Sequence, residues 1–545
     1  MLYFVPAWYD GDKWKENEEY WYRKKARSEF DETIKQIQLI HRNRMAPYEI
    51  LLLSHAPNFR HFLHRQGLFR ANYWSCFDCI QQIKRKKIAT LSYHSLKWPE
   101  GVEFIYSPFT INAFLNGKRY AEVEFGENGN PISVILYVGE QICRVNEYDD
   151  RGFLSATTVY ENGKPHQKDY LMEDGIWKMR ESLPDGKIAI NPRTPEFTVV
   201  VGGRMKEVTF SALEYANIRD VIREVFYANM DSCKVQDIFI VAAHRLHMHM
   251  LTELLKNRQV IMTFFENRFT DADLLAYREE LQGSDYLITD AKDTAETLRQ
   301  KLGMSRDAVF DISPYDTRVD FGISQQMKVQ NILVPVDGVA EQTFERLILD
   351  VAGYLQKNEK ARVQFFTRNA DYGFREQIMQ RTENLLMKYG FDRRWISEQT
   401  QIALGENGVD AMEEEAVEPR FFFQQAVDER SISKCIHEQR VILDMRNTTD
   451  VFLFVTAISK GVPRIAVCQD QYLQHLRNGY VMKSLDETGV ALAYYLDSLD
   501  NWNEALVGCY EMGQVSLKIL LRMLGGEQVS RTHTFLPHKL VVRES

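Results

Sequence analysis

The sequence has no long hydrophobic run. Among its 545 residues no stretch reaches the roughly 18 consecutive apolar residues that a membrane-spanning helix needs. The apolar start MLYFVPAW has no basic residues before it and no small-residue cleavage site behind it. We therefore expect neither a membrane span nor a signal peptide.

Positive charge, proline and cysteine are also scarce. The 67 Lys and Arg residues are outnumbered by 76 Asp and Glu, and the net charge of −9 argues against nucleic-acid binding, which requires a cationic surface. Seven scattered cysteines do not form a secreted disulfide framework, so we expect a cytoplasmic protein. With 15 prolines and 45% hydrophobic residues the chain is globular, and its length predicts several domains.

Common catalytic and metal-binding motifs are missing as well. The sequence contains no G-x-x-x-x-G-K, G-x-G-x-x-G, G-x-S-x-G or H-E-x-x-H, so ATPase, dinucleotide oxidoreductase, serine hydrolase and zinc protease functions have no motif support. Cys76 and Cys79 form a single C-x-x-C, which predicts two thiols on a helix and not a zinc site. We expect no cofactor and no metal.

Short apolar segments alternate with amphipathic stretches over most of the chain. This rhythm is typical of mostly parallel sheets covered by helices on both faces, so the fold class is α/β with two Rossmann-like lobes. Expected strands of the first lobe are 2–5, 50–53, 237–243, 259–265 and 285–289, and those of the second lobe are 331–336, 362–367, 440–445 and 464–468.

Residues 98–205 break this rhythm. Glycines recur every 10 to 13 residues, at positions 117, 129, 139, 152, 163, 175 and 186, often as Asn-Gly or Asp-Gly. These dipeptides favour the positive φ of tight hairpins, so the segment predicts an inserted antiparallel β-meander. The expected domains are 1–97 and 206–325 for the two parts of the first lobe, 98–205 for the insertion, and 326–545 for the second lobe with a C-terminal helix. We expect the insertion to be a partner-binding surface that can be excised to leave two folded lobes.

Residues 448–481 resemble the donor lobe of retaining glycosyltransferases of the GT-B fold. The matching features are the turn around Gly461 and Pro463, the strand behind it, and the loop that begins at Asn478. The resemblance implies two glutamates eight residues apart that contact the donor sugar and the ribose. Thr448 and Thr456 stand at those positions, and a threonine hydroxyl cannot replace a carboxylate.

The resemblance also implies an Arg and a Lys after the first strand of the second lobe, where they would neutralise a diphosphate. The sequence here is VDGVAEQTFER, with Asp337 and Glu341 and no cation before Arg346. Arg368, after the next strand, is a substitute in principle, although it is also explained as a solvated strand end. We therefore expect a pseudoenzyme with no catalytic residues.

Ligand candidates remain in the expected cleft. In AAHRLHMHM, His244 matches a functional histidine of active transferases, but the run with His247 and His249 is better explained as an exposed helix start than as a metal site. The candidates are listed here together: His244, Arg368, Gly461, Pro463 and Asn478.

Over nearly its whole length, including YFVPAWY, the YENGKP and MEDGIW hairpins and ISPYDTR, the chain resembles the glycosyltransferase-like accessory secretory proteins of the accessory Sec system. That resemblance implies a non-catalytic factor that assembles with two other accessory secretory proteins and an accessory SecA ATPase to export a glycosylated serine-rich-repeat adhesin. An active adhesin glycosyltransferase and a lectin-like module are the alternatives. The basic runs at 23–27 and 84–87 leave open a peripheral contact with the anionic inner face of the membrane.

Overall fold

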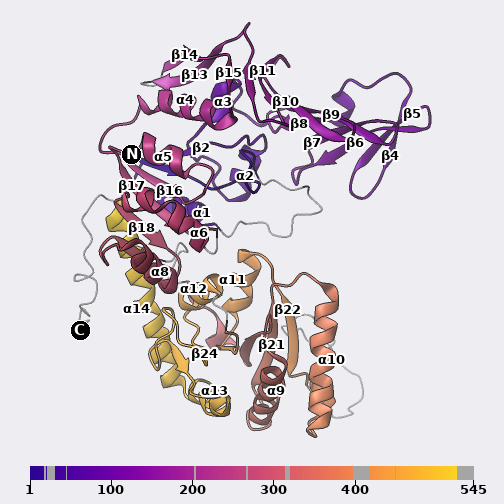
Figure 1. The fold of residues 1–545 in the computed structure, drawn as a ribbon. Coiled ribbons are helices and arrows are strands. Elements are labelled where there is room, and N and C mark those ends of the chain that lie inside the picture. The colour runs from indigo at the N-terminus through magenta and orange to yellow at the C-terminus, as the bar shows by residue number, and fades with distance from the viewer. Residues whose placement is uncertain are drawn as a thin grey trace. The chain divides into compact units, whose positions relative to one another are not determined.

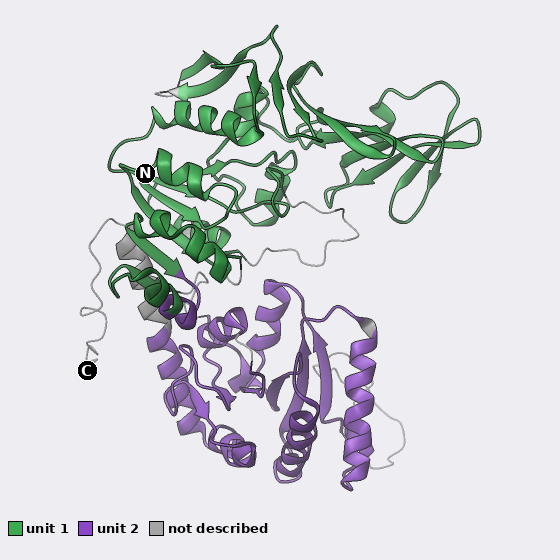
Figure 2. Ribbon diagram, viewed as in Figure 1, with its two compact units in different colours: residues 1–27, 31–288, 297–310 green, residues 28–30, 289–296, 311–545 purple. Residues whose placement is uncertain are grey.

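The computed structural model describes residues 1–16, 20, 31–43, 46–201, 204–265, 268–312, 320–396, 418–447 and 450–524. These residues fall into two compact units (Figure 2). The first unit holds most of residues 1–288 together with 297–310, and the second holds 289–296 and most of the chain from residue 311 onward. No helix of the described residues is long and apolar enough to cross a membrane.

A seven-stranded sheet forms the centre of the first unit (Figure 1). Its order is β19-β18-β17-β16-β1-β2-β3, and β1 pairs in parallel with β2 and with β16. All four residues of β1 are buried, as expected for a strand covered on both faces. The strands are β1 (Leu2–Val5), β2 (Tyr48–Leu52), β3 (Tyr73–Ser75), β16 (Ile238–Ala242), β17 (Gln259–Phe264), β18 (Tyr286–Thr289) and β19 (Val309–Asp311).

Short amphipathic helices connect these strands. Cys76 and Cys79 lie on one of them, α3, as free thiols, which confirms the helical prediction for the C-x-x-C. The helices are α1 (Glu32–Asn43), α2 (Phe59–Arg65), α3 (Cys76–Ile80), α4 (Ile218–Met230), α5 (Met248–Leu254), α6 (Asp271–Ala276), α7 (Arg278–Gln282) and α8 (Lys292–Leu302).

A ten-stranded antiparallel sheet is inserted between β3 and β16, which confirms the predicted meander. Its order, β15-β12-β11-β10-β9-β8-β7-β6-β5-β4, follows the chain apart from β15. All seven glycines of the 10-to-13-residue spacing have positive φ, between 64° and 84°. The strands are β4 (Val102–Tyr106), β5 (Ile111–Leu115), β6 (Lys118–Phe125), β7 (Pro131–Val138), β8 (Gln141–Asp149), β9 (Phe153–Glu161), β10 (Lys164–Leu171), β11 (Trp177–Ser182), β12 (Ile188–Ile190) and β15 (Glu214–Tyr215).

The antiparallel segment and the first parallel sheet belong to one compact unit. Its strands continue to Tyr215, beyond the expected end at residue 205, and a separate hairpin of β13 (Glu196–Val201) and β14 (Arg204–Thr209) packs against α3 and α4. Phe197 and Val199 of β13 are fully buried. The insertion is therefore anchored to the first unit by a hydrophobic contact as well as by its two chain connections.

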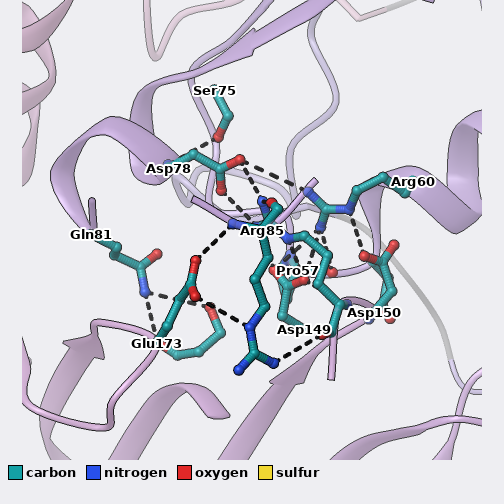
Figure 3. Close-up of polar contacts among 12 residues, drawn as sticks. Pro57, Arg60, Ser75, Asp78, Gln81, Arg85, Asp149, Asp150 and Glu173 are labelled. Atoms are coloured by element: carbon teal, nitrogen blue, oxygen red, sulfur yellow. Dashed lines mark hydrogen bonds and ion pairs between the residues drawn. The ribbon is translucent and has the colours of Figure 1, made fainter. Parts of the chain in front are cut away.

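A network of buried charges, shown in part in Figure 3, joins the insertion to α2 and α3. Arg60 of α2 donates from Nε to Asp150 at 2.5 Å and from Nη2 to Asp149 at 3.2 Å. Arg151, from the insertion, donates to Asp78 of α3 through both terminal nitrogens at 2.8 Å and to Asp149 from Nε at 2.7 Å. Asp149 has a lowered pKa, since the charges of Arg60 and Arg151 outweigh the opposing effect of burial. We call these five residues the root network.

Further hydrogen bonds surround the root network. Gln81 donates to the carbonyl of Ser155 at 2.8 Å, and the N–H of Asp150 donates to the carbonyl of Pro57 at 2.9 Å. Glu173 accepts from the N–H of Arg85 at 2.8 Å (Figure 3). The root of the insertion is thus bonded to the first unit through side chains and main chain alike.

The second unit has a six-stranded parallel sheet in the order β22-β21-β20-β23-β24-β25. Numbered along the chain this is 3-2-1-4-5-6, the order of a doubly wound Rossmann sheet, with the switch between β20 and β23. The strands are β20 (Gln330–Pro335), β21 (Ala361–Thr367), β22 (Phe421–Gln425), β23 (Val441–Asp444), β24 (Arg464–Ala466) and β25 (Gly479–Val481).

Helices α9 (Glu341–Leu355), α10 (Tyr372–Lys388), α11 (Glu429–His437), α12 (Val451–Lys460), α13 (Thr488–Leu496) and α14 (Leu499–Leu524) complete this unit. The two Rossmann-like sheets confirm the predicted α/β class. Strands β3, β19, β22 and β25 were not expected, because three of them are only three residues long and β22 reads as a short aromatic run. The expected linker at 313–322 lies mostly outside the described residues.

Candidate functional site in the second unit

Ligands of doubly wound sheets bind at the carboxyl ends of the strands, beside the switch point. In the second unit that place is where β20, β21 and β23 end and where α12 begins. Five charged residues gather there, and we call them the switch-point ring: Asp337, Arg368, Asp444, Arg446 and Asp450.

Asp337 follows β20 and binds the end of the neighbouring strand β21. One carboxylate oxygen accepts the N–H of Arg368 at 2.8 Å, and the other accepts the hydroxyl of Thr367. Asp337 is therefore engaged in holding two strand ends together. A negative charge in this position would repel a diphosphate.

Asp450 caps the first turn of α12 and accepts the N–H of Leu453 at 3.1 Å. The same carboxylate accepts from Arg368 Nη2 at 2.8 Å. Arg446 lies 3.7 Å from Asp450 and forms a bidentate pair with Asp444, both bonds at 2.9 Å. Burial alone would lower the pKa of Arg446, and its hydrogen bonds to Asp444 raise it instead.

The ring therefore contains three carboxylates and two guanidiniums, and each guanidinium is paired with a carboxylate. Arg368 keeps 32% of its side chain exposed but is ion-paired with Asp450. The prediction of a solvated arginine at a strand end therefore describes it only in part. The chemistry of this arrangement is structural pairing. It presents no uncompensated positive charge with which to stabilise a phosphoryl leaving group.

A cavity of about 580 Å³ lies beside the ring in the same unit. Arg464 on its wall is ion-paired with Asp470, and its guanidinium stacks on Phe454 at 3.5 Å from the ring centroid. The charges of the lining are three of each sign, so the cavity is polar and balanced. The lining residues are Ala291, Lys292, Asp293, Asp444, Arg446, Asn447, Phe454, Arg464, Ala466, Cys468, Gln469, Asp470, Gln471 and Tyr472.

The other residues singled out from the sequence have packing roles. Thr456 is buried in α12, and Thr448 lies outside the described residues. Gly461 ends α12 with φ 68°, and a Cβ there would meet Leu506 and Phe321 at 3.1 Å.

The carbonyl of Pro463 accepts a hydrogen bond from the N–H of Ile442 at 3.0 Å. Asn478 is buried, donates to the carbonyl of Tyr472 at 2.8 Å and accepts the N–H of Gln474 at 2.7 Å. Neither residue lines the cavity. Their roles as ligands stay predictions, and the contacts described account for them without a ligand.

His244, in the first unit, follows β16. Its ring lies 4.9 Å from that of Tyr9, and burial, then the charge of Arg268, lowers its pKa to about 4. His247 is fully buried, with Nε2 2.8 Å from the carbonyl of Ala242 and Nδ1 2.8 Å from the hydroxyl of Tyr9. A carbonyl only accepts, so Nε2 carries the proton and Nδ1 accepts from the tyrosine.

The interpretation of this run as an exposed helix start is thus wrong for His247, which is fully buried, whereas His244 is half-buried in the loop before α5. The interpretation holds for His249, which is exposed and 3.0 Å from Glu280. The sequence could not predict this, because the spacing of histidines in a loop before a helix does not show which of their side chains are buried. The described residues contain no cluster of ligands that would hold a metal.

Burial lowers the pKa of His247 to about 3, whereas an unfolded histidine titrates near 6.5. The unfolded chain therefore binds more protons below pH 6.5, and His247 should reduce stability by about 1.4 kcal/mol for each pH unit below that value. Between pH 7.5 and pH 5, the free energy of unfolding measured by urea titration should fall by about 2 kcal/mol less in His247→Gln than in wild type. The exposed control His249→Gln should keep the wild-type difference. Equal pH dependence in wild type and His247→Gln would refute the assignment.

Comparison with known proteins gives a consistent set of matches. The model of one protein family, described as the first accessory secretory protein of the accessory Sec system, matches residues 1–536. A relative of that description from Streptococcus gordonii is 31% identical over 523 residues, 95% of this chain and 96% of the relative. One from Staphylococcus aureus is 27% identical over 513 residues, 93% of this chain and 94% of the relative.

Two solved structures are similar over nearly the whole chain. One is a chain from the crystal structure of accessory secretory proteins 1, 2 and 3 of Streptococcus pneumoniae. It is 26% identical, with a TM-score of 0.77, and the match covers 96% of this chain and 100% of that chain. The other is from the glycosylation-associated (Gap123) complex of Streptococcus agalactiae, with 27% identity, a TM-score of 0.75, and coverage of 96% and 98%.

The pneumococcal O-GlcNAc transferase GtfA, solved with UDP and GlcNAc, is 10% identical with a TM-score of 0.61 over 96% of this chain and 97% of its own. At that identity the match concerns the fold alone. It confirms the prediction of a GT-B architecture.

Proposed function

This chain belongs to the family of the first accessory secretory protein of the accessory Sec system, and from that membership we propose a non-catalytic role in the accessory Sec export machinery. The chain assembles with the other two accessory secretory proteins. The observation that carries the proposal is its similarity, over 96% of its length, to chains solved within such complexes.

The assembly hands a glycosylated serine-rich-repeat adhesin to the accessory SecA ATPase on the cytoplasmic side of the translocon. Contact with the anionic membrane surface is peripheral. The exposed basic run from Lys84 to Lys87 supports such a contact.

The switch-point ring supports the absence of transferase activity. An active donor site needs a carboxylate on the ribose, a second acid near the sugar and cations on the diphosphate. Here Thr456 replaces one acid, Asp337 stands where the cations belong, and Arg368 is paired with Asp450. Each lost charged hydrogen bond weakens binding by about 1.5 to 3 kcal/mol, so the loss of several removes micromolar affinity for a nucleotide sugar.

The proposal is tested by purifying the chain from cells that express both partner proteins. We expect stoichiometric co-purification and a loss of adhesin export when the gene is deleted. A chain that exports adhesin normally when neither partner can be captured with it would contradict the assembly. Transfer of sugar from a UDP-sugar to adhesin peptide would contradict the non-catalytic role.

We also expect the former donor positions to be dispensable. Thr448→Ala with Thr456→Ala should leave adhesin export at the wild-type level, and no common UDP-sugar should give a calorimetric titration. Glutamate at both positions should not create activity, because Asp337 would still oppose the leaving group. The matched control is Thr382→Ala, which removes a buried threonine from another helix, α10. A severe export defect in the folded double variant but not in this control would mean that the site retains a function.

A further inference from the structure

Strand β4 ends the antiparallel sheet, and its outer edge is open. It pairs with β5 on one side, and no other strand of the described residues pairs with it. The turn that links them begins with a hydrogen-bonded pair, Ser107 N to Thr110 O at 3.0 Å. Because bonded and non-bonded pairs alternate in an antiparallel ladder, the main-chain groups of alternate β4 residues face outward.

The outward residues are Val102, Phe104 and Tyr106, whose partners across the ladder form the non-bonded pairs. Over the described part of the chain, no backbone hydrogen bond connects their outward N–H and C=O groups to another segment. Figure 1 places β4 and β5 at the end of the sheet farthest from α3 and α4. Among the described residues, this edge therefore presents a row of donors and acceptors that no other strand pairs with.

Natural proteins usually protect such an edge with a bulge, a lysine, a proline or a very short strand. The β4–β5 pairing has no register shift, although all six pairings from β5–β6 to β10–β11 have one. The opposite end of the sheet is protected, since β15 is two residues long and lies against α4. The sheet thus has one blunted edge and one regular open edge.

Apart from Glu103, the side chains of β4 are apolar or aromatic. Ile105 is 55% exposed, and Tyr106 is 64% exposed with its hydroxyl 2.9 Å from that of Tyr93. On one face Phe104 contacts the rings of Tyr93 and Trp98 at 5.3 Å, which forms a half-exposed aromatic surface beside the strand. An added strand would meet this surface with alternate side chains, while its main chain bonded to β4.

We propose that the open edge of β4 binds an extended segment of one of the partner accessory secretory proteins as an additional β-strand. The inference rests on the proposed function, because that function supplies partners whose interfaces must lie on this chain. Glu103 is the one charged residue of β4, and the segment it receives is therefore largely uncharged and apolar at alternate positions.

The test measures the affinity of the complete chain for its co-purified partners. Ile105→Lys places a charge at the edge, and Tyr106→Pro removes an outward N–H without touching the ladder to β5. Each should weaken the complex by about tenfold or more. The matched control for Ile105→Lys is Val138→Lys, an equally apolar and 71% exposed site on the inner strand β7, which should stay within about threefold of wild type. The matched control for Tyr106→Pro is Tyr106→Ala, which removes the same side chain but keeps the outward N–H and should therefore weaken the complex less than Tyr106→Pro does.

Partner affinity unchanged in Ile105→Lys and Tyr106→Pro would overturn the inference while leaving the proposed function intact. A wild-type chain that binds neither partner would remove the proposed function itself. If Ile105→Lys instead converts a self-associating chain into a monomer with partner binding unchanged, the occupant is a second copy and the proposal is wrong.

Discussion

Arg60→Ala is expected to lower the free energy of unfolding of the first unit by about 3 to 5 kcal/mol. The side chain of Arg60 is 7% exposed and serves two buried carboxylates, Asp149 and Asp150. Removing it leaves Asp150 buried without its cation, while Asp149 keeps Arg151, and a buried charge without its partner is strongly destabilising. Urea titration followed by tryptophan fluorescence measures the loss.

Two further variants give this prediction its contrast. Arg60→Lys keeps the charge but not the fork that reaches both carboxylates, so an intermediate loss is expected. Arg223→Ala breaks the exposed pair with Glu253 and should change stability by less than about 1 kcal/mol. Equal effects of Arg60→Ala and Arg223→Ala would show that the root network does not stabilise the unit.

Deletion of the whole insertion, residues 98–205, is expected to unfold the first unit. The sequence suggested that this deletion would leave two folded lobes, and the root network is the reason that we now predict the opposite. The deletion removes the partners that Arg60 and Asp78 have in the insertion, and it removes β13, which packs against α3 and α4 through buried side chains. Loss of protection of β1 and β16 in hydrogen exchange would report it.

A shorter deletion should spare the fold. Leu91 N donates to Asn130 Oδ1 at 3.2 Å, which places residues 91 and 130 near each other, so residues 92–130 are removed and Leu91 is joined to Pro131. This removes β4, β5 and β6 and retains the root network. We expect protected β1 and β16, together with lost partner binding. Protection of β1 and β16 in the 98–205 deletion, or its loss in the 92–130 deletion, would contradict the role given to the root network.

Much of the architecture follows from local sequence patterns. Apolar runs of four to seven residues mark the central strands of both parallel sheets, because strands buried on both faces need continuous apolar side chains. The glycines of the insertion mark its hairpins because the turns require positive φ. The expectation that Thr448 and Thr456 stand at the donor-site acids, and Asp337 at the cations, also comes from the sequence alone and stays a prediction.

The pairing of charges could not be read in this way. Arg60 and Asp150 are 90 positions apart, and Arg368 and Asp450 are 82 apart. Nothing in either local sequence specifies the partner. Any Asp or Glu can pair with an arginine, and the folded backbone decides which one lies within reach. The same holds for His247, whose hydrogen-bond partner Tyr9 is 238 positions away.

The sequence by itself determined the two Rossmann-like lobes, the antiparallel insertion and the family, because these depend on period, turn chemistry and residue identity along the chain. Tertiary structure alone decided which charges are neutralised, which histidines are buried and that β4 is an open edge. Strand order and burial are set by contacts between distant segments, and a strand sequence such as VEFIY reads the same at the edge of a sheet as in its interior.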